Sequence, residues 1–159
     1  MQSRAVTLRL ARTADATAMS AMARDLIETG LGWHYLPERV ARLIEDHDTA
    51  SLVACDAAGV QGSAVMQFGD ERAHLVVLCV RTSRQRLGIG RRLLEWLLAS
   101  ARVAGIASIH LELRADNLSA LAFYRALGFV ETRIVPGYYD GRIAARRMER
   151  LLRAPSAAD

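Results

Sequence analysis

The stretch Gln85-Arg-Leu-Gly88-Ile-Gly90-Arg-Arg92 lies between a strand-like run that ends at Val80 and a helical pattern that begins at Arg91. Its two glycines let the backbone pass close to a bound group, and the first turn of a helix presents N–H groups that have no partner within the helix. Its arginines add positive charge. This composition and position predict a cradle for a pyrophosphate group. The stretch has neither the lysine of a Walker A loop nor the third glycine of a dinucleotide-binding fingerprint.

Around this loop, hydrophobic periodicity and turn residues predict one α+β unit. Upstream, we expect a strand over Val6–Ala11, a helix capped by Thr13, a helix beginning at Pro37, and antiparallel strands over Ser51–Cys55, Val60–Phe68 and Ala73–Val80. Downstream, we expect a helix over Arg91–Val103, a strand over Ile106–Arg114, a helix over Leu118–Leu127 capped by Asn117, a strand over Phe129–Val135, a turn over Pro136–Gly141, and a last segment, Ile143–Leu152, that fits a strand or a helix.

The chain has 159 residues, of which 52% are hydrophobic, which is enough for one core. We predict a single domain over residues 1–153 and a frayed tail over 154–159. No apolar run reaches the roughly 20 residues that a membrane span needs, and the first residues lead into strand-like sequence rather than a signal segment. These features predict a cytoplasmic protein without a membrane partner.

Charge and cysteine content narrow the class of ligand. The net charge is +4, and all 21 basic residues are arginines. Arginine binds phosphate through a planar fork of donors, so the excess suits a polyanionic ligand, whereas nucleic-acid binding is only a minor alternative at this charge. Cys55 and Cys79 each lie in an apolar run, which favours buried thiols over a disulfide or a metal centre. No metal site is predicted.

Two motifs together resemble a known family. Val80, followed five residues later by Gln85-x-x-Gly88-x-Gly90, resembles the coenzyme A signature of the GNAT N-acetyltransferases. The stretches Leu111-Glu-Leu-Arg-Ala-Asp-Asn117 and Ala122-Phe-Tyr-Arg-Ala-Leu-Gly-Phe129 resemble the second motif of that family. The resemblance extends over nearly the whole chain. Within the family it is strongest to the ribosomal-protein-alanine N-acetyltransferases, through the Leu111–Asn117 stretch and Gly137-Tyr-Tyr-Asp-Gly-Arg142.

The resemblance implies a GNAT-like mixed, mostly antiparallel central sheet flanked by helices, and acetyl-coenzyme A as the acetyl donor. Tyr124 would be the general acid. The implied cofactor-binding residues are Leu78, Cys79, Val80, Gln85, Arg86, Leu87, Gly88, Ile89, Gly90, Arg91 and Asn117. Attack on a thioester builds negative charge that a strand amide can stabilise, and it expels a thiolate that a phenol can protonate. The alternatives are a buried strand at residues 78–80, a simple helix cap at Asn117 and a packing role for Tyr124.

The amine needs a base, because an alkylammonium has a pKa of about 10. Glu112 matches the position implied by the ribosomal-protein-alanine subgroup, and its alternative is a solvated strand face. His74 is the rival, since histone-type members of the family place a glutamate six residues before the position of Val80. We favour Glu112.

The acceptor is a primary amine, either a protein N-terminus or a small molecule. The segment Arg142–Met148 lacks the acidic pair that the subgroup carries after its arginine, which leaves both acceptors open. The alternative from another class is a catalytically weak, coenzyme-A-binding sensor or interaction module. A homodimer is also left open.

Overall fold

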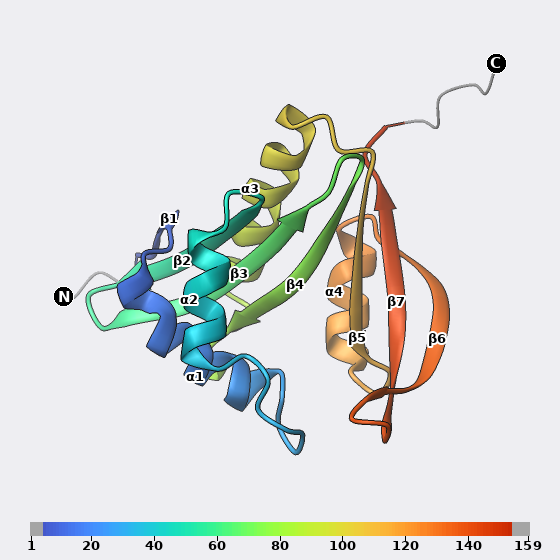
Figure 1. Ribbon diagram of the computed structural model, residues 1–159, viewed down its shortest axis with the longest axis horizontal. Coiled ribbons are helices and arrows are strands. Elements are labelled where there is room, and N and C mark those ends of the chain that lie inside the picture. Colours follow the sequence, from blue (N-terminus) through green and yellow to red (C-terminus); the bar gives the residue numbers. More distant parts are fainter. Residues whose placement is uncertain (1–4, 154–159) are drawn as a thin grey trace.

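The computed structural model describes residues 5–153 and contains a seven-stranded sheet with the order β1-β2-β3-β4-β5-β7-β6 (Figure 1). Neighbouring strands are antiparallel except β4 and β5, which are parallel. The strands are β1 Thr7–Leu10, β2 Thr49–Asp56, β3 Gly59–Phe68, β4 Arg72–Val80, β5 Ser108–Arg114, β6 Val130–Tyr139 and β7 Ile143–Leu151. The α-helices are α1 Ala16–Leu26, α2 Pro37–Glu45, α3 Ile89–Val103 and α4 Leu118–Ala126, with 3-10 turns η1 Thr13–Asp15 and η2 Thr82–Arg84. The predicted mixed, mostly antiparallel sheet is confirmed.

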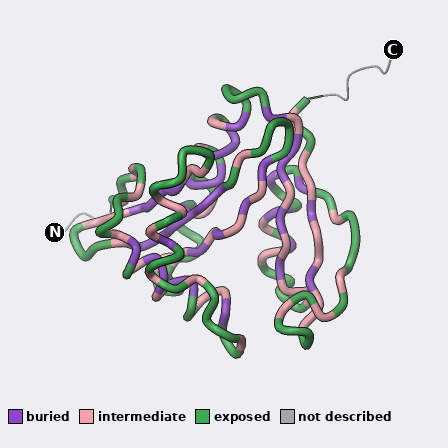
Figure 2. Tube along the Cα trace, in the orientation of Figure 1, coloured by how far each residue is buried: buried purple, intermediate pink, exposed green. Residues whose placement is uncertain are grey.

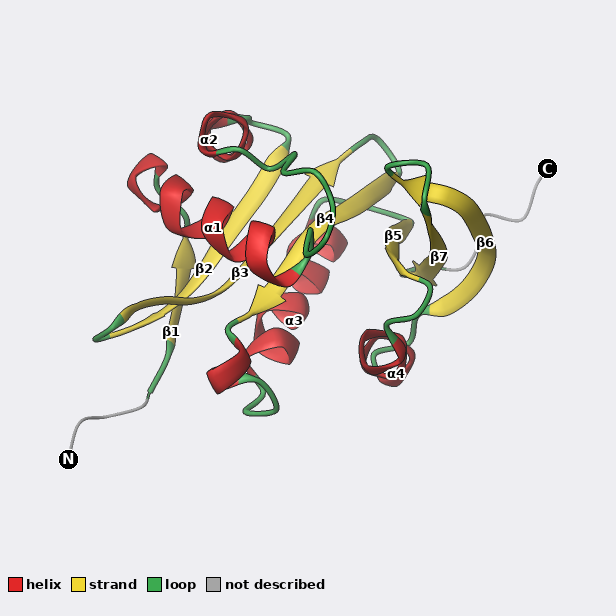
Figure 3. Ribbon diagram, turned by 90° about the horizontal axis from the view of Figure 1, so that it is seen from below, coloured by secondary structure: helices red, strands yellow, loops and turns green. Residues whose placement is uncertain are grey.

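Helices cover both faces of the sheet. α1 and α2 lie on one face, and α3 and α4 lie on the other (Figure 3). Met19 and Met22 of α1 pack with Val53 in the smaller core, while Leu94 of α3 and Phe129 belong to the larger one. Buried residues accordingly follow the strands and the inner sides of the helices (Figure 2). Each fully buried side chain of this size contributes roughly 1.5–3 kcal/mol relative to exposure.

β4 changes its buried face halfway along its length. Its pairing with β3 skips Val76, which is a β-bulge. Leu75 therefore packs in the core under α3, whereas Val77 packs in the core under α1. One extra residue reverses the alternation of a strand. As a result, the side chains of Leu78 and Val80 contact the α3 core at the end of the strand.

The two halves of the sheet separate beyond a short contact. β4 pairs with β5 only through residues 72–74 and 108–110. Past this contact the two strands diverge (Figures 1 and 3). β5 continues by pairing with β7 over seven residue pairs. The edge of β4 that faces away from β3 therefore has no strand partner beyond His74 within the described residues.

The start of the first helix differs from expectation. The sequence predicts a helix capped by Thr13, but Thr13–Asp15 forms the turn η1 and α1 begins at Ala16. The carboxylate of Asp15 accepts the N–H of Arg12 at 2.7 Å and pairs with Arg9 at 2.7 Å. An acidic side chain that reaches back three residues in this way satisfies the N-terminus without a threonine cap.

The last hairpin also differs. The expected turn over Pro136–Gly141 is shorter, because β6 continues through Pro136 to Tyr139 with irregular pairing. β6 is an edge strand, where the missing N–H of proline is tolerated. The segment over Ile143–Leu151 is a strand, with β5 on one side and β6 on the other, and not the helix that remained an alternative.

Within residues 5–153, no helix is long and apolar enough to cross a membrane. The frayed tail predicted over residues 154–159 lies outside the described part of the chain. Cys55 and Cys79 are free thiols.

Candidate active site

A cavity of about 720 Å³ lies between β4 and α4, and both sequence motifs contribute to its walls. The walls come from the end of β4, the glycine-rich loop Gln85–Arg92 and one face of α4. The cofactor-binding residues predicted from the sequence that line it are Leu78, Cys79, Val80, Gln85, Arg86, Gly88, Ile89, Gly90, Arg91 and Asn117, and Tyr124 lines it too. Leu87 is not among the lining residues, and its side chain is 61% exposed.

The glycine-rich loop turns sharply before α3. Arg86 and Gly88 both have left-handed backbones, with φ of 65° and 84°, and Gly88 is the N-cap of α3. Asp56 of β2 holds Arg84 in an ion pair, and the side chain of Gln85 donates to the carbonyl of Val80 at 3.0 Å. A Cβ atom on Gly88 would meet no atom within 4 Å, so the space beside it is open. The loop is anchored at its N-terminal end and presents the N-terminus of a helix, which suits an anion.

Two residues of the second motif belong to the α4 region, Asn117 as the N-cap of the helix and Tyr124 within it. The Oδ1 atom of Asn117 accepts the N–H of Ala120 at 3.1 Å, so the predicted helix cap is confirmed. Tyr124 is buried against the rings of Phe123 and Phe129, with centroids 5.1 and 5.6 Å away. Burial, and to a lesser extent the neighbouring Cys79, raises the pKa of Tyr124. Its phenol therefore keeps its proton at neutral pH and is available as a donor.

Cys79 lies in the same cavity wall as a neutral thiol. Burial raises the pKa of Cys79 to about 12, and Arg81 only partly opposes this shift. The thiolate is the nucleophilic form of cysteine. The structure thus agrees with a packing role for Cys79 and offers no support for a covalent intermediate on it.

The two rival bases contact each other. His74 Nε2 lies 2.6 Å from Glu112 Oε2, and the other carboxylate oxygen of Glu112 accepts from Arg147 Nε at 3.1 Å. The side chain of Glu112 is 7% exposed, so the solvated face considered as its alternative is wrong. Burial alone would raise the pKa of Glu112, but the hydrogen bonds and charges of His74 and Arg147 outweigh burial and hold that pKa below its usual value. His74 and Glu112 are therefore joined as one hydrogen-bonded pair.

His110 completes this cluster. Its ring stacks on that of His74, with centroids 4.4 Å apart, and its Nδ1 atom is buried without a hydrogen-bond partner in residues 5–153. Burial lowers the pKa of His110, and the neighbouring His74 adds to the effect. Ligand atoms of His74, His110 and Glu112 lie within 4.8 Å of one another, as in a metal site. However, both oxygens of Glu112 are already paired, and the guanidinium of Arg147 adds positive charge beside it.

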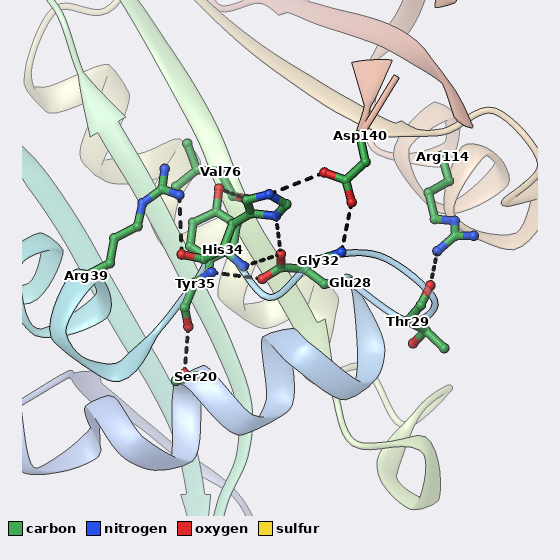
Figure 4. A network of polar contacts seen from close by, with 10 residues as sticks. All are labelled: Ser20, Glu28, Thr29, Gly32, His34, Tyr35, Arg39, Val76, Arg114 and Asp140. Carbon is green, nitrogen blue, oxygen red and sulfur yellow. Dashed lines mark hydrogen bonds and ion pairs between the residues drawn. The ribbon is translucent and has the colours of Figure 1, made fainter. Parts of the chain in front are cut away.

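A second polar network holds the loop between α1 and α2 (Figure 4). The buried carboxylate of Glu28 accepts the backbone N–H groups of His34 at 2.7 Å and Tyr35 at 2.9 Å. It also contacts His34 Nδ1 at 2.8 Å. One carboxylate thereby fixes the end of the loop and the orientation of the His34 ring.

The same loop is tied to the turn between β6 and β7. Asp140 accepts the N–H of Gly32 at 2.8 Å and lies 3.3 Å from His34 Nε2. Two arginines donate to loop carbonyls, namely Arg114 to Thr29 at 2.6 Å and Arg142 to Gly30 at 2.7 Å. We call these contacts of Asp140, Arg114 and Arg142 with residues 29–34 the loop clasp, and Figure 4 shows those of Asp140 and Arg114. The clasp joins the two halves of the molecule on the side of the sheet where α1 lies.

Three tyrosines share the electrostatic surroundings of Glu112. Burial is the largest cause that raises the pKa values of Tyr35, Tyr138 and Tyr139, and the negative charge of Glu112 adds to it for each. Tyr35 also lies near β4, with its hydroxyl 3.5 Å from the carbonyl of Val76. These phenols remain protonated at neutral pH and can donate hydrogen bonds.

Several residues of this region have little or no local signal in the sequence. Arg147 pairs with Glu112 only because β7 lies beside β5 in one particular register, for which the sequence carries no local signal. Asp140 lies in a turn with two glycines, and this place in a turn is the one sequence feature that could have pointed to it. Glu28 precedes the loop that the clasp holds and gave no pattern of its own.

Comparisons with known proteins bear on the same site. The model of the acetyltransferase (GNAT) family matches residues 20–129. The ribosomal protein bS18-alanine N-acetyltransferase of Escherichia coli strain K12 is 42% identical over 82 residues, which are 50% of this chain and 55% of that protein. An N-alpha-acetyltransferase of Mycobacterium tuberculosis is 49% identical over 55 residues, or 35% of this chain and 33% of that protein. The chain thus spans about half the length of the curated relatives it matches first.

Solved structures match over more of the chain. The ribosomal-protein-S18-alanine N-acetyltransferase from Escherichia coli is 27% identical, with a TM-score of 0.81, and the match covers 98% of this chain and 99% of that one. A protein from Thermoplasma volcanium named Ard1 is also 27% identical, with a TM-score of 0.82 and coverage of 94% and 99%. The order of strands and helices is therefore that of known acetyltransferase structures.

Proposed function

Because the chain belongs to the GNAT acetyltransferase family, we propose that it transfers the acetyl group of acetyl-coenzyme A to a primary amine by direct attack. The observation that carries this proposal is that the glycine-rich loop, the end of β4 and Tyr124 line one and the same cavity. This cavity would bring together a thioester donor, the backbone N–H groups of β4 that hold its carbonyl, and an acid for its leaving group.

The donor would bind along β4. The open N-terminus of α3 and the backbone of residues 86–91 would hold the pyrophosphate, with Arg86 and Arg91 adding charge. The edge of β4 beyond His74 has backbone groups without a strand partner in the described residues. Groups at residues 78–80 on this edge would bind the pantetheine arm and polarise the acetyl carbonyl. Asn117 would contact the coenzyme from the start of α4.

Acetyl transfer then needs one proton removed from the attacking amine and one proton supplied to the departing thiolate. The pair of His74 and Glu112 would accept the proton of the attacking ammonium, directly or through water, and His74, which is 30% exposed, would release it to solvent. Attack of the amine breaks the thioester bond, and Tyr124 would protonate the departing thiolate. In this proposal Glu112 and His74 are parts of one base rather than rivals.

For the acceptor we favour the α-amino group of a protein N-terminus over a small-molecule amine. The relative from Escherichia coli is named for acetylation of an alanine of a ribosomal protein. An α-amino group has a pKa of about 7.7–8.0 against about 10.4 for lysine, so much less driving force is needed to deprotonate it. The lowered pKa of Glu112 makes it a weak base, which suits the more acidic amine. The run of arginines in β7 in place of an acidic pair keeps a small-molecule amine as the second candidate.

Turnover assays test the proposal directly. Purified protein with acetyl-coenzyme A should release free thiol with peptides that have a free N-terminus, and much less with the same peptides blocked at that amine. Polyamines, amino acids and aminoglycosides form the comparison panel. Binding of acetyl-coenzyme A without turnover on any amine would instead favour the sensor or interaction module.

The cytoplasmic location of the protein and its assembly into a homodimer stay predictions.

A further inference from the structure

A second cavity, of about 460 Å³, adjoins the first on the side of α3. It lies between α3 and the C-terminal end of α4. Its lining residues are Arg91, Glu95, Leu98, Arg102, Ala126, Leu127, Gly128 and Arg150. Arg91, Ala126 and Leu127 also line the first cavity, so the two cavities are neighbours that share part of their walls.

The lining of the second cavity is positively charged. It contains three arginines and one acid, Glu95, which is already paired with Arg91 at 2.8 Å. The side chain of Arg102 has no hydrogen-bond or ion-pair partner among residues 5–153. Because α3 rises about 1.5 Å per residue, Arg102 lies more than one helical turn beyond Leu98 along the groove. A charge with no partner of its own is available to a ligand.

Arg150 is held in place by its surroundings. It donates from Nη1 to the carbonyl of Leu127 at 2.6 Å, which satisfies the end of α4. Gly128 gives it room, because a Cβ atom at that position would lie 3.3 Å from Arg150 Nε. A guanidinium that is held by donating one hydrogen bond keeps its remaining N–H groups in a defined direction at low entropic cost.

We propose that this second cavity binds the 3′-phosphate of coenzyme A through Arg102 and Arg150. The inference rests on the proposed function, because the pyrophosphate held at Arg86–Arg91 would place the adenosine end of the coenzyme next to Arg91. A phosphate monoester carries about two negative charges and offers oxygens that match the donor fork of arginine. The protein would thus distinguish coenzyme A from its 3′-dephospho form, which lacks this group alone.

The test compares acetyl-coenzyme A with acetyl-3′-dephospho-coenzyme A. Wild-type protein should bind the phosphorylated donor about 3- to 10-fold more tightly, the size expected for charge-assisted contacts in a partly exposed groove. Arg102→Gln removes one charge without breaking a side-chain hydrogen bond or ion pair among the described residues. It should bring the ratio of the two dissociation constants close to one, while the constant for the dephospho donor stays the same. Arg42→Gln on α2, on the opposite face of the sheet, removes the same charge and should leave the ratio unchanged (Figure 1).

Arg150→Gln should also lower the ratio of the two dissociation constants. Because this change removes the donor to Leu127 as well, thermal unfolding serves as the control for its effect on stability. A second comparison uses nucleotides that lack the acyl arm. Wild-type protein should bind adenosine 3′,5′-bisphosphate more tightly than adenosine 5′-monophosphate. Equal affinity of wild-type protein for the two donors would overturn the proposal, and so would a ratio that Arg102→Gln leaves intact. If wild-type protein bound neither donor, the proposed function itself would fail.

Discussion

The left-handed backbone at Gly88 allows the cost of folding to be separated from the cost of ligand binding. Replacing Gly88 (φ 84°) with alanine adds a Cβ atom that meets nothing within 4 Å, so the fold loses only conformational energy. A non-glycine residue in this region costs roughly 1–2 kcal/mol. For a chain of this size, that corresponds to a fall in Tm of roughly 2–8 °C. The new atom would also occupy the open space beside the helix N-terminus, where the pyrophosphate is proposed to lie.

Gly105 provides the matched control. Its φ is 79°, its added Cβ atom would also meet nothing within 4 Å, and it lies at the opposite end of α3. Gly88→Ala and Gly105→Ala should therefore lose similar Tm without ligand. Acetyl-coenzyme A at 100 times its Kd adds about 2.7 kcal/mol, or roughly 5–11 °C, to wild-type protein and to Gly105→Ala. Gly88→Ala should lose most of this gain. Equal ligand-induced shifts in the two variants would refute the binding role of the loop.

Four further predictions concern the chemistry and the loop clasp. Tyr124→Phe should lower kcat by roughly 10²- to 10⁴-fold with the KM for acetyl-coenzyme A nearly unchanged. Full activity of this variant would show that Tyr124 only packs in the core and is not the general acid. Arg147→Gln removes a cation beside Glu112, so the acidic limb of kcat/KM should move to higher pH, and an unmoved limb would argue against Glu112 as part of the base. The folded-state pKa of Glu112 lies below its unfolded value of about 4.5, so its ion pairs stabilise the fold above that pH and are lost as pH falls through the folded pKa. Glu112→Gln should accordingly reduce the loss of Tm between neutral and acidic pH, as measured by thermal unfolding. Asp140→Ala breaks the clasp at Gly32 and should raise the KM for the acceptor several-fold without changing that for acetyl-coenzyme A, which two-substrate kinetics would separate.

Much of the fold could be predicted because local patterns agree with the tertiary structure. The helical spacing of α3 and the asparagine cap of α4 lie where the sequence indicates them. Prediction was weaker where long-range pairing decides the local structure. In β7 the buried residues are Ala145 and Met148, three positions apart, which is closer to a helical than to a strand period. Strand pairing on both sides of β7 overrides that pattern. The bulge at Val76 is likewise a feature of pairing and leaves no mark in the sequence.

The candidate site shows the same difference between features set by local sequence and features set by long-range pairing. The geometry of the glycine-rich loop could be predicted because it depends on backbone conformation and on a helix start, which are local. The relation between His74 and Glu112 depends on the short parallel contact of β4 and β5, which no local pattern contains. Sequence reasoning therefore set two residues against each other that the structure joins by a hydrogen bond.

The arginines around the glycine-rich loop have one more consequence, since the chain contains no lysine at all. Acyl thioesters react with free amines without any catalyst, and a lysine beside a bound donor is exposed to that side reaction at high local concentration. A guanidinium stays protonated at all physiological pH values and has no free lone pair with which to attack. In the proposed function, the loop would therefore attract the phosphates of a reactive donor with cations that the donor does not acylate. The positive charge of the site is therefore chemically durable, and no side-chain amine of the protein can compete with the acceptor.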